Sequence, residues 1–390
     1  TGNDASQYMT SSVITPTQVA LGYGSLYTPI DGVLGLTEGN RAANQALRPE
    51  LTTEVEFGFE AKLLNNRLGV DATYYNKNTK DQIILATIAP ETRFTSQARN
   101  IGLVNNQGVE LRVSAVPVKT KDFSWDIAVT YAKNTSEVKE LWEGAKEYVI
   151  FSAYGVNFKA IAGQPLGVFT TPQAATTPDG KVIVASTGRP TIDPVNQKVV
   201  GTSAPDFTAG FTNRFTYKGI SLGCVIDMRQ GGKFWSNTAE LMAFDGNSTI
   251  TTYNGRQPFL VPNSVKNIGT TAAPKYVEND IPIGWQAMYS YYNHSTNTVM
   301  YEKMVLDKSY IKLREVTLSY VLPKSLFVDK AISSMEVSFI GRNLLMWTPQ
   351  ENNFVDPEAT NYGNDLLSDF GEFSAGPTMR NIGGSIKIIF

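Results

Sequence analysis

Polar and apolar residues alternate with a period of two along most of this chain. In residues 54–63 one set consists of Val55, Phe57, Phe59, Ala61 and Leu63, and the residues between them are Glu54, Glu56, Gly58, Glu60 and Lys62. The same alternation recurs at 67–76, 109–115, 123–131, 207–217, 220–229, 308–321, 333–347 and 381–390. A period of two is that of a β-strand with two unlike faces, and helical spacing is hard to find. The pattern therefore predicts an all-β protein.

Two kinds of β-protein produce this alternation. In a soluble β-sandwich, one face of each sheet packs on a core. In a membrane barrel, one face of each strand meets lipid. The apolar phase here stays unbroken for about ten residues, the length of a strand that crosses a bilayer. Aromatic side chains near the ends of the apolar stretches resemble an interfacial girdle: Tyr74, Trp125, Tyr131, Tyr217, Tyr320 and Trp347.

The lengths of the connections favour the barrel. The short connections are at 64–66, 119–122, 218–219 and 322–332, and the long connections are at 85–104, 139–204, 233–305 and 348–378. This alternation places every long connection at one end of the strands, as in outer-membrane barrels. Loops of such length are uncommon in a soluble domain. The sequence thus predicts a transmembrane antiparallel β-barrel, with 1–50 as an external loop that leads into barrel strands over 51–390.

Three residues fit this pattern poorly. Asn213 falls on the apolar phase of its strand, and so do Lys312 and Arg314. For the two cations, either a β-bulge shifts the phase of the strand, or the side chains lie above the lipid boundary near the external rim.

Composition excludes several classes of function. The 34 basic and 36 acidic residues nearly balance, so a nucleic-acid surface is not expected. A single cysteine and a single histidine exclude an internal disulfide framework and a histidine zinc cluster. We expect Cys224 to act as a small hydrophobic residue and His294 to be a solvated loop residue. No run of about 18 apolar residues predicts a transmembrane helix. We predict no enzyme activity, no catalytic residue, no metal and no cofactor.

Two sets of residues are candidates for contact with a solute. Polar side chains of the alternating strands are expected to face a water-filled lumen: Glu54, Glu56, Glu60, Glu110, Arg112, Asp126, Asp227 and Arg229. Aromatic side chains in the connection 233–305 are candidates for stacking on sugar rings or peptide side chains: Phe234, Trp235, Tyr253, Trp285, Tyr289, Tyr291 and Tyr292. The alternative for the second set is that these rings pack the loop on itself or on a partner. The residues do not separate a glycan from a peptide.

Several stretches, in their order and spacing, resemble SusC-type (SusC/RagA) TonB-dependent transporters of Bacteroidetes outer membranes. They are NQALRPE (44–50), NNRLGVDATYYNKNTKDQI (65–83), NNQGVELRV (105–113), DFSWD (122–126), APDFTAGFTNRFTYKGISL (204–222), SYIKLREVTLSYVLPKSL (309–326), GRNLLMWT (341–348), DPEATNYG (356–363) and the terminal Phe390. The resemblance runs from about residue 44 to the end of the chain.

The resemblance implies a multi-pass protein of the outer membrane of a Gram-negative bacterium. It implies a barrel of about 22 strands, of which this chain supplies a C-terminal arc of about nine. The opening residues, TGNDASQYMT, lack a basic start and an apolar stretch, so we expect a mature or truncated start. The plug, the TonB-contacting segment and the remaining strands are expected in an N-terminal part of the same transporter. Phe390 resembles the C-terminal aromatic residue that, in such transporters, acts as a signal for the barrel assembly machinery.

The resemblance also implies a function and partners. A transporter of this type imports nutrients, here oligosaccharides or peptides, that a SusD-like surface lipoprotein delivers. The TonB complex supplies the energy through the N-terminal part. The alternative is a non-transporting outer-membrane adhesin or receptor barrel.

Overall fold

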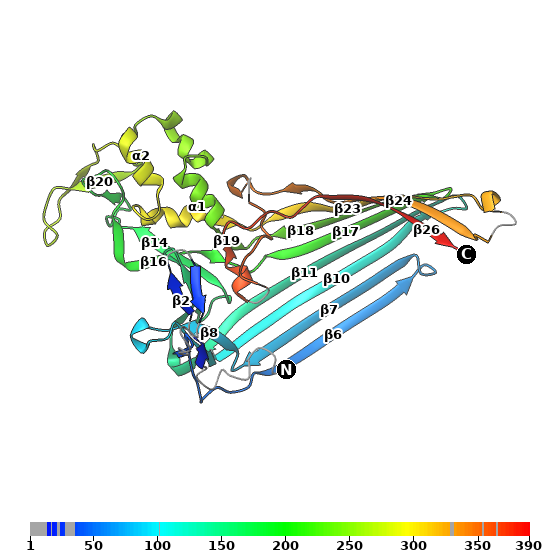
Figure 1. Ribbon diagram of the computed structural model, residues 1–390, viewed down its shortest axis with the longest axis horizontal. Helices are drawn as coiled ribbons and strands as arrows, with labels where there is room; N and C mark the ends of the chain where they lie inside the picture. The colour runs from blue at the N-terminus through cyan, green and yellow to red at the C-terminus, as the bar shows by residue number, and fades with distance from the viewer. Residues whose placement is uncertain are drawn as a thin grey trace.

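The computed structural model describes residues 14–16, 18–21, 24–27, 36–100, 102–327, 331–352, 355–363 and 366–390. Within these residues, nine long strands form one antiparallel sheet in the spatial order β26–β24–β23–β18–β17–β11–β10–β7–β6 (Figure 1). In chain order the strands are β6 (Leu51–Leu63), β7 (Leu68–Lys80), β10 (Gly102–Lys119), β11 (Phe123–Leu141), β17 (Phe207–Tyr217), β18 (Ile220–Gln230), β23 (Tyr310–Val321), β24 (Ser334–Trp347) and β26 (Asn381–Ile389). The prediction of an all-β chain with an arc of nine strands is confirmed.

Some strands run further than the alternation of apolar residues indicated. β17 has the predicted bounds, but β10 begins at Gly102 and β11 continues to Leu141, with Gly102 paired to Leu141. Residues 102–104 and 139–141 of the predicted loops 85–104 and 139–204 therefore belong to strands. The ladder between the two strands continues through polar residues, whose backbone groups pair although their side chains give no apolar period.

Cross-strand register separates the sheet into a polar and an apolar face. One row of directly paired residues crosses seven strands on the polar face: Glu60, Asp71, Arg112, Thr130, Gly210, Asp227 and Lys312. The neighbouring row on the other face reads Phe59, Ala72, Leu111, Tyr131, Ala209, Met228, Ile311 and Trp347. Large apolar side chains of this face are exposed to solvent, among them Phe57 at 68% and Phe59 at 63%. A soluble sandwich would cover such a face with a second sheet.

A β-bulge explains the two cations that fell out of phase. Val225 pairs with Glu315 and Ile226 pairs with Leu313, so Arg314 is the extra residue on β23. A bulge shifts the alternation by one residue, which brings Lys312 and Arg314 to the same face as Asp227. The first of the two predicted explanations is therefore the correct one.

Asn213 is the third misfit, and its polar group is satisfied locally. The side chain is buried, and its Oδ1 accepts a hydrogen bond of 3.0 Å from Nε1 of Trp125. The ring of Trp125 stacks on Phe215 at 5.6 Å. An amide on an apolar face is tolerated when a partner satisfies it.

The long connections fold together into a body at one end of the sheet, on the left of Figure 1. We call the described residues of 142–206, 231–309 and 348–380 the loop body. It contains a sheet of β12 (Glu147–Ala153), β13 (Val156–Ile161), β14 (Val168–Ala174) and β16 (Ile192–Thr202), and a second one of β22 (Val305–Asp307), β19 (Lys233–Ser236) and β25 (Gly371–Glu372). A third sheet joins β15 (Val182–Val184), β20 (Ser264–Asn267) and β21 (Tyr276–Glu278). Its helices include α1 (Asn237–Phe244), α2 (Trp285–Tyr292), and the 3₁₀ segments η3 (Thr249–Arg256) and η4 (Thr298–Met304).

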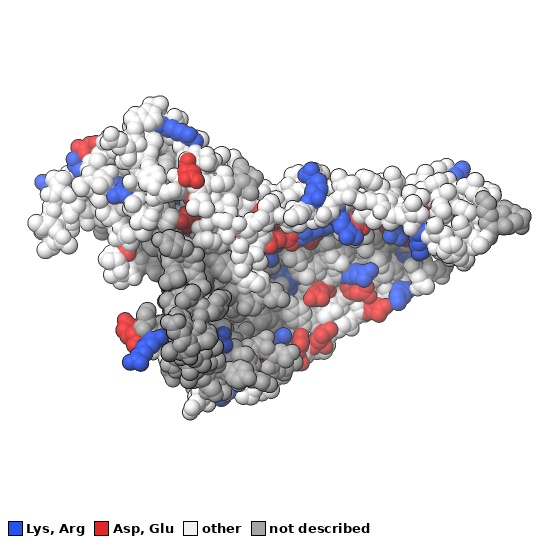
Figure 2. Space-filling view, in the orientation of Figure 1, with Lys and Arg blue, Asp and Glu red and all other residues white. Residues whose placement is uncertain are grey.

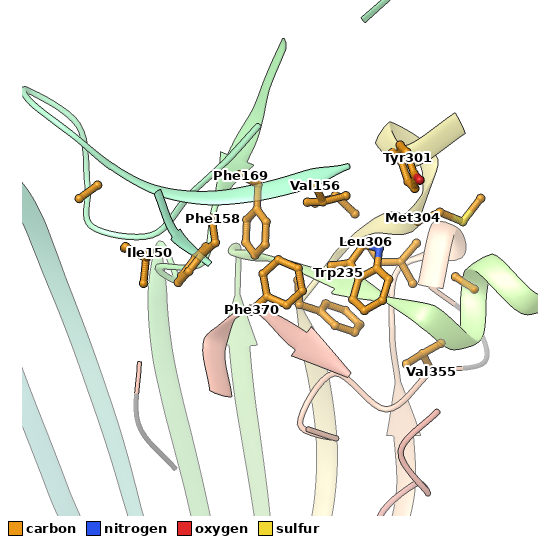
Figure 3. Close-up of a cluster of buried hydrophobic side chains, with 14 of the residues drawn as sticks. Ile150, Val156, Phe158, Phe169, Trp235, Tyr301, Met304, Leu306, Val355 and Phe370 are labelled. Atoms are coloured by element: carbon orange, nitrogen blue, oxygen red, sulfur yellow. The ribbon is translucent and has the colours of Figure 1, made fainter. Parts of the chain in front are cut away.

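The loop body has its own hydrophobic core (Figure 3). Phe370 lies at its centre, with ring centroids 5.4 Å from Trp235, 5.8 Å from Phe169 and 6.1 Å from Phe158. These rings come from three long connections, so the core ties the connections to one another. The long connections are thus folded structure and not free loops. Neither α-helix in the described part of the chain has the length and apolarity needed to cross a membrane.

Before β6, the described parts of the predicted external loop 1–50 form short strands. β1 (Ile14–Pro16) pairs with β4 (Leu36–Glu38), and β2 (Gln18–Leu21) pairs with β3 (Gly24–Tyr27). β5 (Arg41–Ala42) runs parallel to β9 (Ser96–Asn100), which forms a hairpin with β8 (Ile83–Thr87). The remaining residues of this segment (1–13, 17, 22–23 and 28–35) lie outside the described residues.

The sheet does not close on itself. β6 and β26 form its two edges, and within the described residues each pairs with one strand of the sheet only. Among the described residues β6 and β26 do not pair with each other, as expected for an arc of a larger barrel.

Candidate functional site

The polar face of the sheet is the first candidate surface. Register places all eight residues predicted to face a lumen on this one face: Glu54, Glu56, Glu60, Glu110, Arg112, Asp126, Asp227 and Arg229. Figure 2 shows acidic and basic side chains on the face of the sheet turned toward the viewer. Residues of opposite charge are directly paired on neighbouring strands: Arg112 with Asp71, and Asp126 with Arg214. Such a surface suits contact with water and polar solutes.

A shallow depression of about 440 Å³ lies on this face, lined in part by Arg112, Thr130, Gly210, Asp227 and Arg314. Gly210 makes room for it, because a Cβ atom there would stand 2.6 Å from Oγ1 of Thr130. A larger residue at position 210 would therefore displace the hydroxyl of Thr130 and occupy part of the depression.

A cluster of charges connects the sheet to the loop body, and we call it the wall–loop network: Asp227, Tyr310, Lys312, Arg314, Asp356 and Glu358. Nζ of Lys312 lies 2.6 Å from Oδ1 of Asp356 and 2.5 Å from Oε2 of Glu358. Arg314 binds Asp227 with Nη2 at 2.5 Å and Glu358 with Nη1 at 2.7 Å and Nη2 at 2.6 Å. The hydroxyl of Tyr310 donates to Glu358 at 2.9 Å.

The two acids of the loop body in this network are held in their charged form. Burial alone raises the pKa of Asp356, but hydrogen bonds from Lys312 and from Thr378 lower it to about 2. Burial likewise raises the pKa of Glu358, and hydrogen bonds from Arg314 and Lys312 lower it to about 2. The attraction of the cations outweighs desolvation at both sites.

Glu372 anchors the same connection to helix α1. Its carboxylate is fully buried and accepts hydrogen bonds from Oγ of Ser236 at 2.5 Å, and from N and Oγ1 of Thr238, each at 2.9 Å. A carboxylate at a helix N-terminus satisfies free backbone N–H groups. The segment 355–378 is therefore fixed to the strands near one end and to helix α1 near the other.

The seven aromatic candidates for ligand contact lie in three different environments. Phe234 and Trp235 are buried in the core of the loop body (Figure 3 labels Trp235), so their prediction as ligand contacts is corrected to a packing role. Trp285 and Tyr289 are exposed on α2, at 59% and 55%. Tyr253, Tyr291 and Tyr292 come together at the wall of a cavity.

This cavity has a volume of about 720 Å³, within the range of small-molecule sites. It lies between η3, α2 and η4 and the start of β19. Its rings form a chain of edge-to-face contacts, in which Phe259 lies 4.9 Å from Tyr253 and 5.2 Å from Tyr291, and Tyr291 lies 5.1 Å from Tyr292. Burial raises the pKa of Tyr291 to about 12, so its hydroxyl stays neutral.

Glu240 and His294 form a buried pair that the sequence did not indicate. Oε1 of Glu240 lies 2.7 Å from Nδ1 of His294, and the two side chains are 4% and 16% exposed. Among the described residues Nδ1 of His294 has no hydrogen-bond partner, so the two groups approach closely without a hydrogen bond. Oε2 of Glu240 has no hydrogen-bond partner in the described part of the chain. The prediction that His294 is a solvated loop residue is wrong.

Burial acts on both members of this pair. It raises the pKa of Glu240 to about 7 and lowers the pKa of His294. The rings of Tyr301 and Tyr154 lie 5.2 and 6.0 Å from the imidazole and exclude water from it. The pair is therefore sensitive to proton uptake near neutral pH.

The described residues contain no candidate metal site, because no group of three or more His, Cys, Asp or Glu side chains among them is arranged to hold a metal ion. Cys224 is half-buried on β18, opposite Asn213 and Val316.

An amphipathic antiparallel sheet with all its long connections at one end is the architecture of an outer-membrane barrel wall. A family model described as "TonB dependent receptor-like, beta-barrel" matches residues 8–287. The chain belongs to this family of TonB-dependent receptor-like β-barrels. The family consists of transporters and receptors and not of enzymes.

Individual relatives agree with this assignment. TonB-dependent receptor P3 of Formosa agariphila is 25% identical in an alignment of 381 residues that covers 90% of this chain and 35% of the relative. TonB-dependent receptor SusC of Bacteroides thetaiotaomicron is 30% identical in an alignment of 197 residues that covers 47% of this chain and 19% of SusC. The solved structure of the RagAB peptide transporter covers 99% of this chain with a TM-score of 0.67 at 20% identity, over 39% of that chain. The chain spans about a third of the length of the F. agariphila relative.

Proposed function

We propose that this chain forms part of the barrel wall and the external loops of a TonB-dependent nutrient importer in the outer membrane of a Gram-negative bacterium. The observation that carries the proposal is the sheet itself. One face exposes rows of large apolar side chains, and the other presents paired charges. The apolar face suits lipid, and the charged face suits an aqueous path for a polar solute.

The open edges support the proposal that these strands belong to a larger barrel. β6 and β26 would leave rows of unpaired N–H and C=O groups if they ended in hydrocarbon, at a cost of several kcal/mol for each group. We infer that further strands of the complete transporter pair with both edges. The length of the curated relatives is consistent with this.

We further propose that the loop body contacts a SusD-like lipoprotein and that the TonB complex acts through another part of the transporter. Exposed apolar side chains on the loop body support a protein contact there: Val195, Val199, Ile268, Leu260 and Trp285. The ligand delivered would be an oligosaccharide or a peptide. Residues of the polar face, including the predicted lumen set, would line its path.

The competing function is a non-transporting adhesin or receptor barrel. Both functions require extraction from the outer membrane with detergent. Only the importer should co-purify with a lipoprotein and take up its ligand in a TonB-dependent manner. A complete protein that assembles but shows neither property would favour the adhesin.

A matched pair of variants tests the orientation of the sheet in the membrane. Val129 is exposed on the apolar face, and its neighbour Thr130 points to the polar face. An arginine at the midplane of the lipid face costs about 2–4 kcal/mol, whereas lumen substitutions mainly tune selectivity. In the complete transporter, Val129→Arg should therefore reduce the heat-modifiable, folded barrel in outer-membrane fractions far more than Thr130→Arg. Equal yields of the two variants would contradict the proposed orientation.

The C-terminal residue provides a separate test of assembly. Phe390 is 82% exposed directly after β26, beyond an apolar run of Ile386 and Ile388. We propose that it acts as a signal for the barrel assembly machinery, whereas a plain interfacial anchor is the alternative. Deleting Phe390 should lower the amount of assembled barrel several-fold, and Phe390→Tyr should preserve it. Normal surface levels of the deletion variant would leave only the anchor role.

A further inference from the structure

Part of the lining of the cavity in the loop body is apolar and buried, and two of its polar side chains already have partners. Met300, Met304 and Phe259 line the cavity and are all buried, and we call these three residues its apolar floor. Lys233 binds Asp307 at 3.2 Å, and Oγ of Ser248 accepts a hydrogen bond from N of Ile250. A hydroxyl group placed against Met300, Met304 and Phe259 would lose water without gaining a hydrogen-bond partner from them, at a cost of about 1–3 kcal/mol.

The geometry of the rings also disfavours a sugar. Stacking on a pyranose requires the open face of an aromatic ring. Here Tyr253 and Tyr291 each pack against Phe259 at interplanar angles of 79° and 86°, and Tyr291 meets Tyr292 at 89°. Ring edges thus cover ring faces along the chain of contacts. Aliphatic and aromatic side chains pack well against the edges of aromatic rings and against the thioether sulfur of methionine.

The rim of the cavity carries opposite charges. Lys303 and Glu351 both line it and are both exposed. The rim can therefore receive a carboxylate and an ammonium or amide group at the same time. An apolar floor below a rim of both charges matches a short peptide with an apolar side chain.

We infer that this cavity binds a short peptide by one apolar side chain, which inserts against Met300, Met304 and Phe259 while the backbone and terminal charges stay at the Lys303–Glu351 rim. The inference rests on the proposed importer function and specifies the class of its ligand. Binding is a property of the loop body, and transport requires the whole barrel, so the two can be tested separately.

The test measures binding of three probes to the complete purified transporter by titration calorimetry. The tripeptide Ala-Leu-Ala is expected to bind at least about tenfold more tightly than Ala-Ser-Ala, because only leucine fills the apolar floor. Maltotriose should displace neither tripeptide from the transporter. Tight binding of maltotriose at this cavity, or no binding of Ala-Leu-Ala, would overturn the inference.

Two threonines of η3 provide a matched pair of variants. Thr249 lines the cavity, and Thr252 does not, although both are exposed. Thr249→Trp should fill the cavity and weaken binding of Ala-Leu-Ala at least about tenfold, while Thr252→Trp should leave it unchanged. Equal affinities of the two variants would refute the site.

The outcomes for the two proposals are distinguishable. If Thr249→Trp has no effect on binding while ligand uptake remains TonB-dependent, the cavity is not the site and the importer proposal stands. If Thr249→Trp abolishes binding of the tripeptide but no TonB-dependent uptake occurs, the cavity is a peptide site on a barrel that does not transport.

Discussion

Replacing Lys312 by methionine is expected to cost about 3–5 kcal/mol of the free energy that holds segment 355–378 against the strands. Lys312 and Asp356 are both almost completely buried, with side chains 3% and 2% exposed. Removing one partner of a buried ion pair leaves the other charge without compensation, and this penalty is several times that of an exposed pair. Glu358 would lose a second ion-pair contact with the same ammonium group.

Hydrogen exchange in segment 355–378 measures this cost in the complete transporter. Lys198→Met is the matched control, because Lys198 binds Glu302 at 2.6 Å in a pair whose side chains are 47% and 30% exposed. An exposed pair contributes about 0–1 kcal/mol, so the control should lose little protection. Similar losses in the two variants would show that the wall–loop network does not hold the segment.

A second substitution separates charge from packing. In the double variant Lys312→Met, Asp356→Asn, the buried charge is removed with its partner, while the new amide oxygen can still accept from Thr378. We expect the double variant to recover part of the lost protection.

The low pKa of Asp356 gives the sign of the pH dependence. The stabilisation that ionised Asp356 contributes to the folded protein is fully present above about pH 4 and is lost as the pH falls toward 2.

The strands were predictable from the sequence because one physical rule governs them. A strand between lipid and water must alternate, so the bounds of β17 could be assigned from its side chains although Asn213 interrupts the alternation. The rule fails where the backbone departs from regular geometry. Lys312 and Arg314 appeared on the wrong phase because the bulge at Arg314 adds one residue to β23, and that misfit was itself the signal for the wall–loop network.

The loop body could not be derived in this way. Phe234 and Trp235 look like exposed aromatics of a long loop, and only the contact with Phe370, from another connection, buries them. Nothing in the sequence near His294 indicates Glu240, since the pair forms between segments that fold together through long-range packing. Local periodicity reports which face a strand buries, but it carries no information on which loops pack against each other.

The Glu240–His294 pair is expected to make the stability of α1 depend on pH in two opposing ways. The pKa of Glu240 is raised from 4.5 to about 7, so its burial costs nothing below pH 4.5, and the cost grows as the pH rises to about 7. At about 1.36 kcal/mol for each pKa unit, the full cost is about 3 kcal/mol. The pKa of His294 is lowered from 6.5, so its cost is absent above pH 6.5 and grows as the pH falls below that value.

Two single variants should therefore show pH profiles of opposite slope. In Glu240→Gln only the histidine titrates, and exchange protection of residues 237–244, corrected for intrinsic exchange rates, should rise with pH between 5 and 7. In His294→Gln only the carboxylate titrates, and protection should fall over the same range. In the unmodified protein the two contributions have opposite slopes below pH 6.5, so its protection should change less with pH than that of either variant. Glu278→Gln, at an exposed position of β21, should retain the unmodified profile. Slopes of the same sign in the two variants would show that the contact at 2.7 Å does not control the docking of α1.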